Sequence, residues 1–266
     1  MKIGFLITAR LKSTRLPEKL LKSLDDKLII ENVIDRIKEV PSISTIVLCT
    51  SINKQDKKLV DVAIENNIYY FNGNEEDVLQ RLLDAAHLYD LDYIIGITGE
   101  NPLFSLHHTN QIIEESRKGV YDLITTRGLP IGCATYAIKT DALELICKIK
   151  QVVDTEIWGY LINQPSVFNN KYIDVDEEYF WPDLRVTCDY PEDFEFLTAI
   201  FNNLDYKRRL DLAGILKYLK QNPQITDIHK DKVQLDLSQE IKDAINNYFT
   251  DNLNYILEEK LKIYNK

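Results

Sequence analysis

The first 120 residues alternate short apolar runs with amphipathic segments, and this rhythm constrains the fold more than any other feature of the chain. The predicted strands cover 3–8, 45–50, 69–71 and 92–98, and the predicted helices cover 29–40, 55–66, 75–89 and 106–117, the last capped by Ser105. Strands that are joined through helices lie parallel, with the helices packed over the sheet. The pattern therefore predicts an α/β fold with a mostly parallel sheet and helices on both faces.

The pattern becomes mixed after Tyr121. Further strands are expected at 134–138, 171–175 and 184–188, and further helices at 141–149, 155–163, 192–204, 211–221 and 238–262. The chain has no Gly/Ser linker, internal repeat or low-complexity tract. We therefore expect one α/β domain over 1–221, followed by a helical C-terminal extension over 222–266 that packs on the core or on a partner subunit.

The charge balance narrows the classes of partner. The 266 residues include 42 acids against 32 Lys and Arg, a net charge of −10, whereas nucleic acid and anionic membranes bind dense cationic surfaces. The four cysteines are far apart and form no CxxC pair, which predicts reduced, mostly buried thiols and no zinc site. The apolar run near the N-terminus is too short for a signal peptide or a membrane span, so a cytoplasmic location is expected.

A basic loop directly follows the first predicted strand. Ligands of open parallel sheets lie beyond the carboxyl ends of the strands, and this loop has four cations and two hydroxyls in an otherwise acidic chain: Arg10, Lys12, Arg15 and Lys19 with Ser13 and Thr14. Such groups suit the non-bridging oxygens of a polyphosphate, with Arg providing a planar fork of donors. The alternative is an ordinary solvated loop.

Four segments, taken together, resemble a known family. They are R-x-x-S-T-R-L-P-x-K at 10–19, G-N-E-E-D-V-L at 73–79, T-G-E-N-P-L at 98–103 and V-T-C-D-Y-P-E-D-F at 186–194. In this order they resemble the cytidylyltransferases that activate acidic sugars, which include the CMP-Kdo and CMP-sialic acid synthetases, and most closely the proteins similar to spore coat polysaccharide biosynthesis protein F. The resemblance implies a Rossmann-like nucleotidyltransferase fold, CTP as a substrate and a homodimer.

The same resemblance assigns roles to residues of the basic loop. It implies a nucleotide-binding set in which Arg10 and Lys19 also stabilise charge during the reaction: Ala9, Arg10, Ser13, Arg15 and Lys19. The family usually has glycine where this chain has Lys12 and Glu18. Because glycine lets the backbone approach phosphate closely, we expect side chains to make more of the phosphate contacts here. The alternative is that the site is altered.

The resemblance also implies that the segment before the third helix contacts the cytosine and ribose. Asn74 and Asp77 are the candidate residues. The alternative is that Asn74 or Glu75 only caps the helix.

Two acids are candidates for a magnesium site. Transfer of a nucleotidyl group needs charge neutralised on the α-phosphate, and Mg²⁺ prefers one or two carboxylates with phosphate and water completing its shell. Glu100 and Asp189 each follow a predicted strand, and the resemblance assigns metal-binding aspartates to these positions. Glu100 departs from that pattern. The alternatives are a solvated loop acid for Glu100 and a helix cap for Asp189.

The sequence indicates the acceptor-binding residues less clearly. By resemblance, the turn-rich loop that begins at Arg127 lines the acceptor pocket, and Glu156 lies where the family often has a Glu-His pair. Arg127 and Glu156 are therefore candidate acceptor-binding residues, although a plain connection at Arg127 fits the sequence equally well. A changed acceptor region indicates a changed acceptor.

The expected function is transfer of CMP from CTP to an acidic sugar, or to a phosphorylated sugar or polyol, with release of pyrophosphate during surface polysaccharide synthesis. One alternative is a nucleotidyltransferase that uses another NTP, and another is a non-catalytic nucleotide-binding relative. A metal-dependent glycosyltransferase shares the broad fold type, but should use a sugar nucleotide and a DxD-type metal motif.

Overall fold

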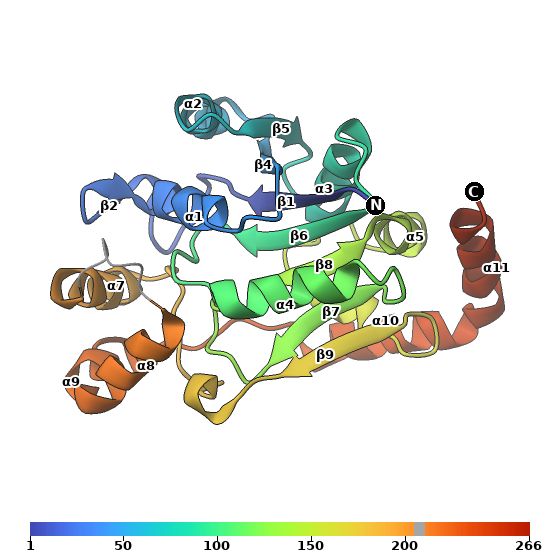
Figure 1. The fold of residues 1–266 in the computed structure, drawn as a ribbon. Helices are drawn as coiled ribbons and strands as arrows, with labels where there is room; N and C mark the ends of the chain where they lie inside the picture. The colour runs from blue at the N-terminus through green and yellow to red at the C-terminus, as the bar shows by residue number, and fades with distance from the viewer. Residues whose placement is uncertain (205–210) are drawn as a thin grey trace.

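A seven-stranded sheet forms the centre of the computed structural model, which describes residues 1–204 and 211–266 (Figure 1). Its strands lie in the order β5-β4-β1-β6-β8-β7-β9. Their bounds are β1 Ile3–Thr8, β4 Thr45–Ser51, β5 Tyr69–Gly73, β6 Tyr93–Thr98, β7 Leu123–Arg127, β8 Tyr136–Lys139 and β9 Asn170–Asp174. Only β8 is antiparallel to its neighbours β6 and β7, while β5, β4, β1 and β6 pair in parallel. The prediction of a mostly parallel sheet is confirmed.

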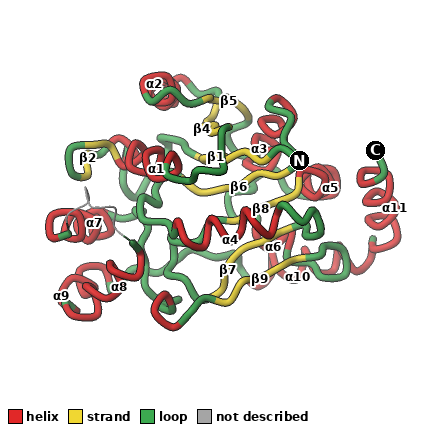
Figure 2. The backbone as a smooth tube through the Cα atoms, in the orientation of Figure 1, coloured by secondary structure: helices red, strands yellow, loops and turns green. Residues whose placement is uncertain are grey.

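Helices cover both faces of the sheet, as the alternation of side chains along its strands requires (Figure 2). In β1, Phe5 and Ile7 join one core cluster, whereas Leu6 between them joins the other. The first cluster also holds buried residues of α1 Ile29–Lys38, α2 Lys57–Glu65, α4 Leu106–Ser116, α7 Pro191–Asn203 and α8 Leu212–Gln221. The second holds residues of α3 Val78–Leu88, α5 Thr140–Ile149, α6 Gly159–Ile162, α10 Gln239–Asp251 and α11 Leu253–Tyr264.

The chain after residue 221 adds to these two clusters. Ile225, in α9 Pro223–Thr226, joins the first cluster, and Phe249, Ile256 and Ile263 join the second. The extension therefore packs on the core of its own chain, one of the two expected arrangements. Among the described residues, no helix combines the length and the apolar character that crossing a membrane requires.

Several predicted elements are wrong or incomplete. The apolar run at 184–188 is no strand, because only Arg185 forms a bridge, to Ile131. The helix expected at 155–163 is limited to α6, and the long helix expected at 238–262 is two helices that meet at Asn252. The sequence patterns did not predict β7 or the short hairpin of β2 Ser23–Leu24 and β3 Lys27–Leu28. The cap at Ser105 is confirmed, since its side chain accepts a hydrogen bond from the His108 N–H.

Candidate functional site

One cavity opens at the carboxyl ends of β1 and β6, where Thr8 and Thr98 are paired neighbours. Its volume of about 590 Å³ lies within the usual range for small-molecule sites. Every polar residue of the basic loop from 10 to 15 lines it, together with Ala9 and Lys19. The loop that the sequence placed beside a ligand therefore forms one wall of a cavity at the edge of the sheet where ligands of parallel sheets bind.

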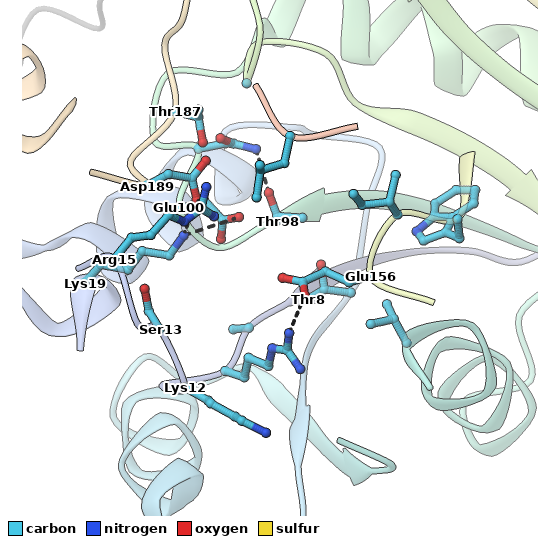
Figure 3. Close-up of a pocket in the computed structure, with 18 of the residues that line it drawn as sticks. Thr8, Lys12, Ser13, Arg15, Lys19, Thr98, Glu100, Glu156, Thr187 and Asp189 are labelled. Atoms are coloured by element: carbon cyan, nitrogen blue, oxygen red, sulfur yellow. Dashed lines mark hydrogen bonds and ion pairs between the residues drawn. The ribbon is translucent and has the colours of Figure 1, made fainter. Parts of the chain in front are cut away.

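The two candidate metal carboxylates lie together beside Lys19 of this loop. Lys19 Nζ is 2.8 Å from Asp189 Oδ1 and 3.8 Å from Glu100 Oε1, and Figure 3 shows these side chains converging. Arg15 Nη2 lies 3.1 Å from the same oxygen of Asp189. The structure therefore brings the basic loop and both acids into a single cleft.

The charges in this cleft hold one another in their ionised forms. Burial alone lowers the pKa of Lys19, but the charges of Glu100 and Asp189 outweigh it, and the pKa is raised. Burial also raises the pKa of Asp189, and the charges of Lys19 and Arg15 reverse this, so that its pKa is lowered. Asp189 is thus an anion over the neutral pH range and can bind a cation.

Asp193 positions Asp189 from behind. The carboxylate of Asp193 is fully buried, and its Oδ2 accepts hydrogen bonds from the backbone N–H of Asp189 at 2.9 Å and of Tyr190 at 3.0 Å. Tyr190 is the N-terminal cap residue of α7. The capping role that was an alternative for Asp189 therefore belongs to Asp193, and the Asp189 side chain is left facing the cavity.

A segment that the sequence did not single out closes one end of the cavity. We call residues 229–235 the strap, and Gln234 and Leu235 in it line the cavity. Arg185 Nη1 donates to Gln234 Oε1, and His229 Nδ1 lies 3.1 Å from Asp193 Oδ1. Arg185 Nη2 also donates to Asp193 Oδ2 at 3.0 Å. The strap is thereby fastened to the residues that hold Asp189.

The predicted base-contacting residues have structural partners. Asn74 Oδ1 accepts hydrogen bonds from the N–H groups of Glu76 and Asp77, and Asp77 caps α3 and pairs with Lys150. Neither Asn74 nor Asp77 lines the cavity. The cap of α3 is thus Asp77, and not Asn74 or Glu75 as the alternative had it, while Asn74 holds the turn before the helix. Neither Asn74 nor Asp77 enters the proposed nucleotide contacts.

Arg81, one helical turn beyond this loop, also lines the cavity. It is 1% exposed, and its Nη1 donates to the carbonyl oxygens of Asn74 and Glu75. In the sequence, Arg81 faces away from the apolar stripe of its helix, which makes it a candidate for contact with a ligand or a neighbouring acid. The guanidinium shapes the 74–76 turn beside the cavity.

The two candidate acceptor residues differ in their placement. Arg127 is exposed, does not line the cavity, and stacks its guanidinium 4.0 Å from the centroid of the Tyr172 ring. Glu156 lines the cavity (Figure 3), and its Oε2 lies 2.6 Å from Arg10 Nη2. Glu156 therefore contacts the basic loop, and Arg127 lies outside this site.

Glu18 accounts for one departure from the family pattern. Its backbone is left-handed, with φ 49° and ψ 30°, a conformation that glycine adopts without strain. The loop therefore retains the geometry that the usual glycine provides. The Glu18 side chain turns to Lys58, with which it forms an exposed ion pair.

Gly132 is required by close packing at the cavity wall. Its φ is +90°, and a Cβ atom would lie 2.6 Å from the carbonyl oxygen of Val186 and 2.8 Å from Asn101 Oδ1. We expect Gly132→Ala to lower the free energy of unfolding by roughly 1–3 kcal/mol, measured by urea denaturation. Gly214→Ala is the matched control, because its Cβ would meet nothing within 4 Å. Equal stability of the two variants would contradict this.

The residues present suit a divalent ion that shares its shell with a substrate. Glu100 and Asp189 provide two carboxylates at one place. Across residues 1–204 and 211–266 there is no cluster of three or more His, Cys, Asp or Glu side chains that could hold a metal. Two carboxylates with phosphate and water are the usual surroundings of Mg²⁺, whereas a structural zinc site needs four protein ligands.

A model of the cytidylyltransferase family matches residues 5–222, which include the basic loop and both acids. The chain belongs to the cytidylyltransferase family. Relatives of this cytidylyltransferase include spore coat polysaccharide biosynthesis protein SpsF of Bacillus subtilis, 25% identical over 83% of this chain and 95% of that protein. The 3-deoxy-manno-octulosonate cytidylyltransferase of Chloroherpeton thalassium is 28% identical over 68% of this chain and 71% of that enzyme. A solved cytidylyltransferase from Leptospira borgpetersenii superposes with a TM-score of 0.78 at 26% identity, covering 89% and 100% of the two chains.

Proposed function

We propose that this cytidylyltransferase moves CMP from CTP to a sugar-type acceptor, either an acidic sugar or a phosphorylated sugar or polyol, in a Mg²⁺-dependent reaction that releases pyrophosphate. One observation carries the proposal. The cations of the loop after β1 and the carboxylates of Glu100 and Asp189 share a single cleft, which is what a triphosphate with its metal requires. The names of the relatives add support for CTP and for polysaccharide synthesis.

The reaction needs positioning and charge stabilisation, and no covalent intermediate with the protein. Arg10, Arg15 and Lys19 would bind the triphosphate together with the Ser13 hydroxyl. An oxygen of the acceptor would attack the α-phosphate in line, and the bond to the pyrophosphate oxygen would break. Positive charge from Arg10 and Lys19 would stabilise the negative charge that moves to the leaving pyrophosphate.

Glu100 and Asp189 would hold Mg²⁺, which when bound neutralises charge on the phosphate oxygens. Glutamate has one more methylene than the usual aspartate, and Glu100 lies farther from Lys19 Nζ than Asp189 does, 3.8 Å against 2.8 Å. Asp189 is therefore assigned the direct contact.

An assay of pyrophosphate release tests the proposal. The wild-type chain and Asp189→Asn would be incubated with Mg²⁺, each of the four NTPs and a panel of acceptors that includes 3-deoxy-manno-octulosonate, a sialic acid and phosphorylated polyols. We expect release from CTP with one acceptor class, and none from the variant. Release from a different NTP would contradict the assignment of the base. Absence of release from every pair, with tight CTP binding, would instead favour a non-catalytic relative.

Glu156 allows a test between two roles. Glu156 pairs with Arg10 in the structure, so a triphosphate that binds Arg10 must displace its carboxylate. Because Glu156 is largely exposed, the pair is weak, and Glu156→Gln should lower the KM for CTP by roughly two- to fivefold, measured by initial rates. A raised KM for the acceptor with an unchanged KM for CTP would show that Glu156 binds the acceptor instead.

Dimerisation and a cytoplasmic location stay predictions. Light scattering coupled to size-exclusion chromatography would measure the mass in solution, with the dimer expected at twice the 31.0 kDa of the chain.

A further inference from the structure

Lys19 occupies the space between the two carboxylates that are proposed to hold the metal. Its ammonium nitrogen is 2.8 Å from Asp189 Oδ1 and 3.8 Å from Glu100 Oε1, and the residue is only 9% exposed. A metal ion that contacted both acids would need the region where this ammonium lies (Figure 3). The lysine is therefore the counter-ion of this pair in the structure.

The surrounding charges leave nothing to attract a free divalent ion. Asp189 also contacts Arg15 Nη2 at 3.1 Å and Arg185 Nη2 at 3.3 Å, and Arg185 contacts Asp193 at 3.0 Å. Three cations, counting the lysine, thus face three carboxylates, counting Glu100. A dication that entered this balanced cluster would meet as much repulsion as attraction.

A polyphosphate changes this balance selectively. Lys19 and Arg15 line the cavity, so phosphate oxygens can take both. Arg185 does not line it, and contacts with Asp193 and Gln234 hold it behind the wall. Binding of a polyphosphate therefore removes two of the three cations from the carboxylates and leaves negative charge facing the phosphates.

We propose that Lys19 masks the metal site, and that the Glu100–Asp189 pair accepts a divalent cation only when a polyphosphate takes Lys19 and Arg15. The metal then enters with the nucleotide or after it, and not before. This inference rests on the proposed function for the identity of the polyphosphate. It concerns the order of binding, which that function leaves open.

Binding of Mn²⁺ alone tests the mask without any nucleotide. Electron paramagnetic resonance of the full chain would measure free Mn²⁺ during a titration. We expect weak binding to the wild type and binding more than about tenfold tighter to Lys19→Met, because one positive charge has left the site. The double variant Lys19→Met with Asp189→Asn should lose this gain. Lys118→Met is the matched control, since Lys118 forms an exposed pair with Glu115 outside the cavity.

A second variant keeps the test decisive if Lys19→Met does not fold, as judged by circular dichroism. Arg15→Gln removes a more exposed cation from the same carboxylate oxygen, and should also tighten Mn²⁺ binding, by a smaller factor. Tight binding of Mn²⁺ to the wild type at these acids would overturn the proposal. So would a folded Lys19→Met chain, or failing that an Arg15→Gln chain, that binds Mn²⁺ no more tightly than the control.

The polyphosphate arm uses inorganic tripolyphosphate, so that it depends on no base or acceptor. In equilibrium dialysis, tripolyphosphate should increase the Mn²⁺ retained by the wild type, and Asp189→Asn should retain less. Equal retention by the two proteins would contradict the proposal. If CTP supports no turnover, the proposed function fails, while these metal measurements still decide whether Lys19 masks the site.

Discussion

Replacing Lys19 by alanine is expected to lower CTP-dependent pyrophosphate release by about a hundred- to a thousandfold, the usual effect of removing one donor that stabilises charge in the transition state. The reason is geometric. The Lys19 ammonium lies in the cleft beside Asp189 and Glu100, on the basic loop that is proposed to bind the triphosphate. Without it, charge on the departing pyrophosphate loses a partner at the moment it develops.

Single-turnover kinetics would measure this loss apart from product release. Lys118→Ala is the control, and its rate should equal that of the wild type. Thermal denaturation should show that the Lys19 variant is folded. Undiminished pyrophosphate release by a folded Lys19→Ala chain would refute the assignment of Lys19 to the reaction.

Replacing Asp193 by alanine is expected to give the largest loss of stability, about 3–5 kcal/mol in the free energy of unfolding, the range observed when one partner of a buried ion pair is removed. Asp193 is fully buried and accepts hydrogen bonds from Arg185 and from the backbone at the start of α7. His229 of the strap contacts its other oxygen. The substitution would leave the Arg185 guanidinium buried, with Asp189 and Gln234 as its remaining partners.

Urea denaturation at neutral pH would measure the loss, with Asp227→Ala as a control because Asp227 forms only an exposed pair with Lys230. If Asp193→Ala lowers the free energy of unfolding no more than Asp227→Ala does, the buried network contributes nothing to folding.

The same carboxylate predicts a pH dependence. Burial raises the pKa of Asp193, but the hydrogen bonds from His229 and Arg185 outweigh burial and bring it well below the ordinary value of 3.8. Since the folded-state pKa is lowered, the stabilisation is complete above the unfolded value and declines as pH falls below it. Asp193→Asn should therefore show a shallower loss of stability than the wild type below about pH 4. Equal slopes would contradict this.

The central sheet could be predicted from the sequence because its strands are continuous apolar runs. The predicted bounds of the runs at 3–8, 45–50 and 92–98 each agree with those of an observed strand to within one residue. The β7 segment Leu-Ile-Thr-Thr-Arg is too short and too polar to show such a run. The break between α10 and α11 at Asn252 interrupts a helical pattern that the spacing of apolar residues continues through.

The site could be predicted in part, because the ends of neighbouring parallel strands share one edge. That rule placed Glu100 beside the loop after β1 correctly. Asp189 lies there too, although the strand expected before it is absent and a single bridge from Arg185 to Ile131 brings the segment to the sheet. The strap was beyond prediction, because its position depends on contacts of His229 and Gln234 with residues 36 and 49 positions away, which no local pattern encodes.

The most direct test of the central claim is a crystal structure of the chain with CTP and Mn²⁺, in which anomalous scattering locates the metal. We expect the triphosphate against the loop of residues 10–19 and the metal in contact with Asp189 and the phosphates, with Lys19 moved from the carboxylates to a phosphate oxygen. A nucleotide bound away from that loop, or a metal that contacts neither Asp189 nor Glu100, would contradict it.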